Sequence, residues 1–269
     1  MPPFSLSYLT APRLHPLEVL KIAAETGYQS IGLRLLPAAP GGEFYPLIDN
    51  KHELPEIVMR MKDTGLFVRD LEMIRINADF NVNDFESFFE VGAQLGAKNI
   101  LVAGDDQDAS RLTESYEKLC EAAAPYNLTA DIEFMPWTAI KSMKDALKIV
   151  KGAHLPKNAG IIIDSLHYAR SDSELSDIDA TPTYLLHYAQ ICDASATIPT
   201  TDEALIRDAR TCRLIPGEGG INLRELFSHL SKDLPISIEV PHEIRQAQMS
   251  PFEWARLCIE ETKKFYKGL

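Results

Sequence analysis

Short apolar runs alternate along this sequence with segments whose apolar residues recur every three or four positions. The runs are typical of buried strands and the periodic segments of amphipathic helices. The pattern predicts eight strands, at Phe4–Leu9, Ser30–Leu35, Phe67–Met73, Asn99–Ala103, Ala130–Phe134, Gly160–Ile163, Tyr188–Cys192 and Ile236–Val240. It predicts helices at His15–Thr26, Glu53–Thr64, Asp84–Leu95, Leu112–Ala124, Ser142–Lys151, Asn222–Leu230 and Phe252–Tyr266.

Strands that alternate with helices indicate βαβ units and a parallel sheet. Eight such units within 269 residues favour an α/β fold that closes into a (β/α)₈ TIM barrel, one domain over residues 1–269, rather than an open sheet. No Gly-x-Gly-x-x-Gly motif follows a strand, so the sequence offers no support for a dinucleotide-binding fold.

The composition limits the kinds of binding partner that we expect for this protein. A net charge of −12 disfavours nucleic acid, and no apolar stretch approaches the roughly 18 residues of a membrane span. The start, Met1–Ser5, lacks the basic and apolar regions of a signal peptide. We therefore expect a cytoplasmic protein that acts on a small molecule without membrane or nucleic-acid partners, and homo-oligomer formation stays open. The cysteines show no Cys-x-x-Cys spacing and are expected to be reduced thiols.

Two segments after the seventh strand have no predicted strand or helix. Residues 194–216 form a long polar loop with arginines at 207, 210 and 213, and loops of this length are often functional. The loop is interpreted either as a lid or as ordinary solvated surface. The turn Pro216–Gly220 either holds backbone near a ligand or simply connects the seventh strand to the next helix.

Polar side chains stand at the ends of the last four predicted strands. These residues are Glu133, Asp164, Gln190 and Glu239. One such carboxylate is often only a loop anchor or a helix N-cap. Four of them on neighbouring strands of a parallel barrel would converge at its C-terminal mouth, where barrel enzymes keep their active sites. The pattern therefore predicts an oxygen-rich site for a divalent metal ion.

Five segments around these residues resemble the xylose isomerase-like TIM-barrel superfamily of sugar phosphate isomerases and epimerases. They are Ile132–Phe134, Ile163–His167, Gln190–Asp193, Arg213–Gly219 and Ile238–Glu239. The resemblance covers essentially the whole chain. It extends to tagatose- and psicose-type 3-epimerases, hydroxypyruvate isomerase, inosose enzymes and 3-dehydroshikimate dehydratases, so it indicates the superfamily but not the substrate.

The resemblance implies that Glu133, Asp164, Gln190 and Glu239 are the ligands of one divalent metal ion. Many members carry His where this sequence has Gln190, and Gln there resembles the hydroxypyruvate isomerase and 3-dehydroshikimate dehydratase branches. An amide oxygen is an acceptable ligand for a hard cation, so the set suits Mn²⁺ or Mg²⁺, with Co²⁺ as a further candidate.

The resemblance also implies that His167 faces a substrate oxygen near the metal, where an imidazole is able to polarise a carbonyl group. The expected reaction is isomerisation or epimerisation of a small polyhydroxy carbonyl compound, a sugar, sugar acid or sugar phosphate, through an enediolate. Glu133 and Glu239 are expected to combine metal ligation with proton transfer on opposite faces of the substrate.

Cationic side chains near the predicted mouth indicate an anionic substrate. Arg210 and Arg213 on the long loop and Arg34 after the second strand are expected to bind it, and Glu72, at the end of the third strand, is expected to line the same pocket. The same cations suit a carboxylate or a phosphate, so the pattern predicts an anionic substrate and does not select the reaction.

Three alternatives stay open. A lyase of the 3-dehydroshikimate dehydratase type would form the same enolate and expel water. An endonuclease IV-like barrel shares the Asp-x-x-His element but needs further histidines that the second to fourth strands lack. A non-catalytic sugar-binding barrel is a different class, which loss of metal ligands would support, and the only departure here is Gln190.

Overall fold

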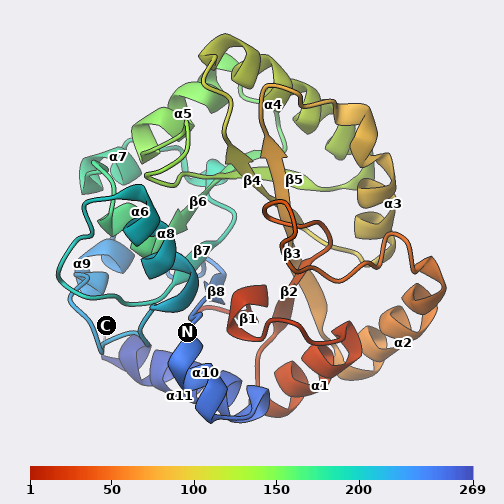
Figure 1. Ribbon diagram of the computed structural model, residues 1–269, viewed down its shortest axis with the longest axis vertical. Helices are drawn as coiled ribbons and strands as arrows, with labels where there is room; N and C mark the ends of the chain where they lie inside the picture. Colours follow the sequence, from red (N-terminus) through yellow and green to blue (C-terminus); the bar gives the residue numbers. More distant parts are fainter. Residues whose placement is uncertain (269) are drawn as a thin grey trace.

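Eight parallel strands close into a barrel in the order of the sequence, which confirms the predicted TIM-barrel fold (Figure 1). The computed structural model describes residues 1–268. The strands are β1 Phe4–Leu6, β2 Ser30–Arg34, β3 Phe67–Ile76, β4 Asn99–Gly104, β5 Thr129–Glu133, β6 Ala159–Asp164, β7 Ala189–Ile191 and β8 Ile236–Ile238. Pairing of β1 with both β2 and β8 closes the ring.

Helices surround the barrel, as Figure 1 shows. They are α1 Pro16–Thr26, α2 Leu54–Thr64, α3 Glu86–Gln94, α4 Ala109–Ala123, α5 Met143–Gly152, α6 Ser165–Ala169, α7 Leu175–Asp179, α8 Asp202–Thr211, α9 Leu223–Ser228, α10 Glu243–Gln248 and α11 Pro251–Lys267. Capping residues mark the first or last turn of several of these helices. Ser142 forms a capping box at the start of α5, and Gly27, with a φ of 85°, ends α1 in the left-handed conformation. None of the helices in residues 1–268 has the length and apolar character needed to cross a bilayer.

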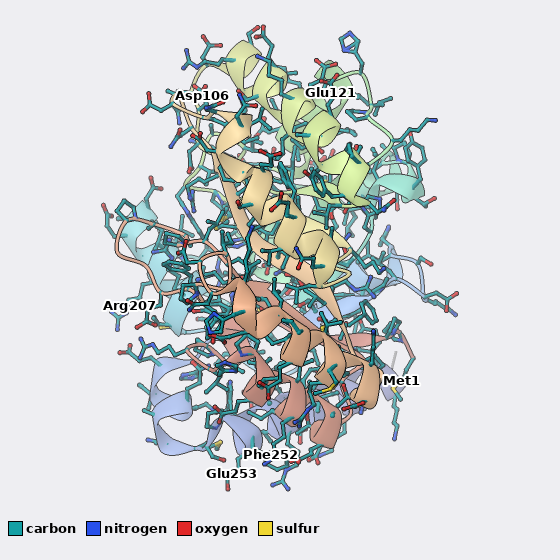
Figure 2. All side chains as sticks on the ribbon, turned by 90° about the vertical axis from the view of Figure 1, so that its right-hand side faces the viewer. Met1, Asp106, Glu121, Arg207, Phe252 and Glu253 are labelled. Atoms are coloured by element: carbon teal, nitrogen blue, oxygen red, sulfur yellow. The ribbon has the colours of Figure 1, made fainter. Side chains whose placement is uncertain are left out.

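The strands run from the face that carries the N-terminus to the opposite face. In Figure 2, Met1 lies on one side of the molecule, whereas Asp106, just past β4, and Arg207 of α8 lie on the other. This second side is the C-terminal mouth of the barrel. It is the face on which the strand-end side chains gather.

Strand alternation divides the buried residues into two groups. Outward-facing residues such as Leu6, Ile132 and Ile161 are fully buried against the helices and belong to the main hydrophobic core. Inside the barrel a smaller apolar cluster includes Leu101 and Ile162. The remaining interior is polar, although barrel interiors are usually filled by branched apolar residues. Its buried polar residues include Ser5, Asp70, Asn99, Asp131 and Ser237.

Asp131 organises the N-terminal end of the barrel. Its carboxylate pairs with His187 at 2.5 Å and accepts hydrogen bonds from Thr129 at 2.6 Å and Asn99 at 2.9 Å. A Cβ atom at position 160 would lie 1.7 Å from its Oδ1, so Gly160 is required for this close approach. His187 therefore has a structural role and stands at the end of the barrel opposite to the metal-ligand candidates.

Asp70 is fully buried inside the barrel, and both of its carboxylate oxygens lack a partner within residues 1–268. It leans over Gly32, where a Cβ atom would lie 3.0 Å from Oδ1. Burial, followed by the charges of Glu72 and Glu239, raises the pKa of Asp70 well above its ordinary value. The folded protein therefore keeps this proton at pH values where the unfolded chain has released it.

Asp70→Asn is expected to stabilise the protein at neutral pH. A raised folded-state pKa gives stability that is fully present below the unfolded pKa of about 4 and is lost as the pH rises towards the folded value. The neutral amide removes that loss, so the free energy of unfolding at pH 7 should rise by about 1 kcal/mol or more. Urea unfolding at pH 4 and pH 7 measures this. A gain of equal size at both pH values would contradict the explanation.

Three of the differences from the predicted boundaries concern the mouth of the barrel. The segment 194–216 is not one irregular loop, because it contains the ten-residue helix α8. The strand β3 continues to Ile76, three residues beyond the predicted end. The first strand stops at Leu6, and Tyr8–Thr10 form a 3₁₀ turn. The helix α8 and the longer β3 determine that Arg210 and Arg75 lie at the mouth of the barrel.

Candidate metal centre

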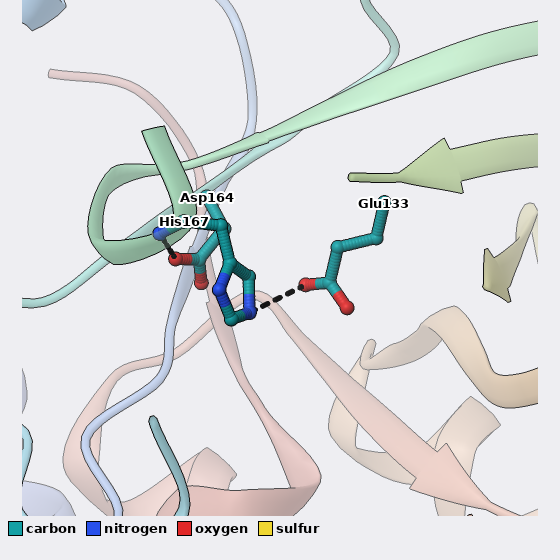
Figure 3. Close-up of side chains that lie close together, drawn as sticks. All are labelled: Glu133, Asp164 and His167. Atoms are coloured by element: carbon teal, nitrogen blue, oxygen red, sulfur yellow. Dashed lines mark hydrogen bonds and ion pairs between the residues drawn. The ribbon is translucent and has the colours of Figure 1, made fainter. Parts of the chain in front are cut away.

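The four predicted ligands all lie at the mouth of the barrel and are almost completely buried. Asp164 ends β6 and is the register partner of Gln190 in β7. The Gln190 amide donates a 2.6 Å hydrogen bond to Glu239, the residue directly after β8. Glu133 ends β5 and presents its carboxylate to the same space. Oxygen atoms of Glu133 and Asp164 and a ring nitrogen of His167 lie within 4.8 Å of one another. Figure 3 shows the imidazole of His167 turned towards Glu133.

His167 is placed by the start of α6. Asp164 is the N-cap of this helix and its Oδ1 accepts a 2.9 Å hydrogen bond from the His167 backbone N–H, so the Asp-x-x-His spacing folds the ring back over the strand end. The ring Nε2 lies 3.9 Å from Glu133 Oε1, and the indole of Trp137 packs edge-on against the imidazole at 5.2 Å. Burial lowers the pKa of His167 to about 4, with Arg213 adding to the shift and Asp164 opposing it.

Arg213 occupies a different position from the one that the sequence suggested. The prediction placed it on a loop for substrate binding, whereas the structure buries it inside the mouth, where only 1% of its surface is exposed. Its Nη1 donates to Asp164 at 2.5 Å, its Nη2 lies 3.0 Å from Glu239, and its Nε donates to the Ala209 carbonyl at the end of α8. Arg213 therefore joins two candidate ligands to α8, and it also lines the cavity above them.

The carboxyl groups differ in their electrostatic surroundings. Burial, and then the charges of Glu239 and Asp164, raise the pKa of Glu133 well above its ordinary value. Burial also raises the pKa of Glu239, to about 7, although Arg213 opposes the shift. At Asp164 burial acts in the same direction, but the charges of Arg213 and His167 outweigh it and hold the pKa below its ordinary value.

The donor set fits a divalent metal ion. Glu133 Oε1 and Gln190 Oε1 are buried oxygens that accept no hydrogen bond within residues 1–268. Oxygen ligands of this kind suit Mg²⁺ and Mn²⁺. When ionised, four carboxyl groups and two guanidinium groups leave a formal charge of −2 at the centre, which one divalent ion balances. They belong to Glu72, Glu133, Asp164, Glu239, Arg34 and Arg213.

A cavity of about 180 Å³ opens directly above these residues. Glu72 lies in its wall, bound to Arg34 at 2.5 Å, and the hydroxyl of Ser7 donates to Glu239 at 2.7 Å and to Glu72 at 3.5 Å. The cavity also reaches Arg210 on α8. The structure thus brings the predicted substrate-binding residues Arg34, Glu72 and Arg210 to one cavity.

Other residues of this cavity were missed by the sequence analysis. Arg75 lies in the part of β3 beyond the predicted strand, and continued alternation through Met73–Ile76 was the signal that could have found it. Trp137 follows β5 in a turn without periodicity, and Ser7 follows a strand that is shorter than expected. A small hydroxyl group after a strand gives no sequence signal for a role in the site.

The turn Pro216–Gly220 has a clear structural role. The Asp193 carboxylate accepts hydrogen bonds of 3.0 Å from the backbone N–H groups of Gly217, Gly219 and Ile221. A Cβ atom at position 219 would lie 2.2 Å from the carbonyl oxygen of Ala194. The glycine-rich turn wraps around Asp193, so the connecting role that the sequence left open is the one observed.

The fold and the site define a TIM barrel with an acidic, buried centre at its C-terminal mouth. A family model described as xylose isomerase-like TIM barrel matches residues 20–258. The chain therefore belongs to this family, as the sequence resemblance indicated.

Two curated relatives match parts of the chain. A 3-dehydroshikimate dehydratase from Pseudomonas aeruginosa is 26% identical over 169 residues, which are 60% of this chain and 26% of that protein. An inosose isomerase from Halalkalibacterium halodurans is 27% identical over 120 residues, 43% of this chain and 39% of that protein. The chain therefore matches well under half the length of either relative.

Among solved structures, the IolI protein with a bound zinc atom superimposes with a TM-score of 0.80 at 18% identity, and the match covers 97% of each chain. At this identity the likeness shows the fold. The curated relatives thus include an isomerase and a dehydratase, and the IolI structure holds a zinc atom.

Proposed function

We propose that this protein is a divalent-metal-dependent isomerase or epimerase of a small polyhydroxy carbonyl compound. The observation that carries the proposal is a cluster of buried donors at the mouth of the barrel. Glu133 and Asp164 lie close to His167, Gln190 is hydrogen-bonded to Glu239, and one oxygen each of Glu133 and Gln190 has no partner within residues 1–268. The inosose isomerase among the relatives supports the reaction class. The ligands would be Glu133, Asp164, Gln190 and Glu239, and the ion would be Mn²⁺ or Mg²⁺, with Co²⁺ as a further candidate.

Different residues of the site would carry out metal binding, proton transfer and polarisation of the carbonyl group. A bound divalent ion would supply Lewis acidity towards neighbouring carbonyl and hydroxyl oxygens. Glu133 on β5 and Glu239 on β8 stand on strands separated by β6 and β7, so one carboxylate is placed to remove a proton from carbon and the other to return it. His167 would donate a hydrogen bond to the carbonyl oxygen, while Trp137 holds the ring in place.

A dehydratase of the 3-dehydroshikimate type is the second candidate. The Pseudomonas aeruginosa relative favours it because it matches the larger share of this chain, and Gln190 suits both reactions. The same proton removal would then be followed by loss of a hydroxyl group as water. A non-catalytic sugar-binding barrel has less support, because the chain retains an acidic residue on each of β5, β6 and β8.

Metal titration tests the proposal. Chelator-treated protein, titrated by calorimetry with Mn²⁺, Mg²⁺, Co²⁺ and Zn²⁺, is expected to bind one ion per chain. The loaded protein is then offered ketoses, hydroxypyruvate, inososes and 3-dehydroshikimate. Failure to bind any of the four ions would refute the proposal, and turnover of 3-dehydroshikimate alone would establish the dehydratase instead.

A further inference from the structure

Three arginine side chains from different elements face the cavity above the metal centre. Arg34 ends β2, Arg75 lies near the end of β3, and Arg210 lies in the last turn of α8. These elements are far apart in the sequence, and only the closed barrel and the inserted helix bring the three guanidinium groups together. Arg213, which belongs to the same stretch of sequence as Arg210, is held among the acidic residues below.

The three arginines differ in how far the protein already neutralises them. Arg75 pairs with Asp105, and Arg34 pairs with Glu72 through one amino group while its buried Nε has no partner within residues 1–268. For Arg210 the same part of the structure provides neither a hydrogen bond nor an ion pair. Arg210 is therefore a guanidinium group without a counter-ion, beside two others.

Two positive neighbours act on Arg210, whose side chain stays exposed to solvent at the edge of the cavity. Partial burial in the cavity wall, and then the positive charges of Arg75 and Arg34, lower the pKa of Arg210. An anion between the three groups would remove the repulsion and form charge-assisted hydrogen bonds.

The position of Arg210 and Arg34 places this charge on the route to the metal centre. Both residues, with Leu9, also border a second cavity of about 600 Å³ that extends between the 3₁₀ turn Tyr8–Thr10 and α10. The arginines thus stand where the small inner cavity meets a wider outer one. A ligand that reaches Glu133 and His167 extends past them.

We propose that Arg34, Arg75 and Arg210 form a subsite for an oxyanion, the carboxylate or phosphate group of the substrate. The subsite anchors one end of the molecule while its carbonyl end reaches the acidic centre. This inference rests on the proposed function for the identity of the ligand as a substrate, but anion binding itself is independent of the reaction. It restricts the substrates to sugar acids, hydroxy keto acids or sugar phosphates and sets aside neutral ketoses.

Anion binding by the metal-free protein tests the subsite. Calorimetry with inorganic phosphate and, separately, with malonate measures affinity for the two oxyanion classes. Arg210→Met is expected to weaken binding of the preferred anion by about 10-fold to 100-fold, the scale of hydrogen bonds to charged groups. Arg207→Met is the matched control, because Arg207 lies one turn earlier on α8, is exposed like Arg210 and lines neither cavity (Figure 2).

The outcomes separate this proposal from the proposed function. Preference for phosphate indicates a phosphorylated substrate, and preference for malonate indicates an acid. Absence of anion binding in the millimolar range, or an equal loss in Arg207→Met, would overturn the subsite. Metal titration of the same variants is a separate readout: Arg210→Met should bind the ion as the unaltered protein does, whereas failure of the unaltered protein to bind metal would refute only the proposed function.

Discussion

Replacing Glu239 by alanine is expected to abolish turnover and to weaken metal binding by at least about 10²-fold while the barrel stays folded. Glu239 has three partners in the site. Its carboxylate accepts hydrogen bonds from Ser7 and Gln190 and pairs with Arg213. Its removal takes away a candidate ligand and also frees the Gln190 amide to rotate. Arg213 keeps Asp164 as a partner, so the loss should not unfold the mouth.

Three measurements check this expectation. Calorimetry gives the metal affinity, circular dichroism and thermal unfolding report the fold, and a coupled assay gives kcat. Glu260→Ala, which removes an exposed carboxylate from α11, is the matched control and should resemble the unaltered protein in all three. A Glu239→Ala protein that binds the ion normally would remove Glu239 from the ligand set.

The sequence predicted those parts of the site that depend on strand order. Glu133, Asp164, Gln190 and Glu239 each end an apolar run, and in a parallel barrel such ends meet whatever the connecting loops do. The closeness of Asp164 and His167 also depends on local sequence, because Asp164 is the N-cap of the helix that carries His167. The metal-ligand candidates therefore followed from short-range pattern and fold class together.

The different positions of Arg210 and Arg213 could not be predicted in the same way. α8 buries only Asp208 and Ala209, so its sequence reads as a polar loop, and what anchors the helix is an ion pair of Asp208 with Arg170 on a distant segment. Whether Arg210 or Arg213 turns inward depends on that anchoring. Periodicity carries no information on such a contact.

Arg75 was missed for a different reason. Its strand was ended at Met73, although Ile74, Arg75 and Ile76 continue the alternation, and β3 runs to Ile76 and pairs with β4 through Gly104. The position of Arg210 thus depends on tertiary contacts, whereas Arg75 and the acidic centre follow from local sequence.

His167→Ala is expected to lower kcat by roughly 10²-fold or more, the usual scale for loss of a general acid or base. The reason is geometric. The imidazole is held by the Asp164 cap and by Trp137, with Nε2 3.9 Å from Glu133 Oε1 and 3.4 Å from Arg213 Nη2, so it lies beside the carboxylate that would move the proton. Its side chain also lines the cavity that would hold the substrate.

Metal affinity decides which role His167 has. A hydrogen-bond donor to the substrate can be removed without loss of the ion, so kcat should fall while calorimetry of His167→Ala gives the metal affinity of the unaltered protein. His52→Ala, which removes an exposed histidine that lines neither cavity, is the control and should leave both quantities unchanged. Parallel loss of kcat and metal would instead make His167 a ligand, which its closeness to Glu133 and Asp164 allows, and an unaltered kcat would make it a structural residue. Because each outcome gives a different pair of numbers, this variant separates substrate polarisation from metal ligation at the mouth of the barrel.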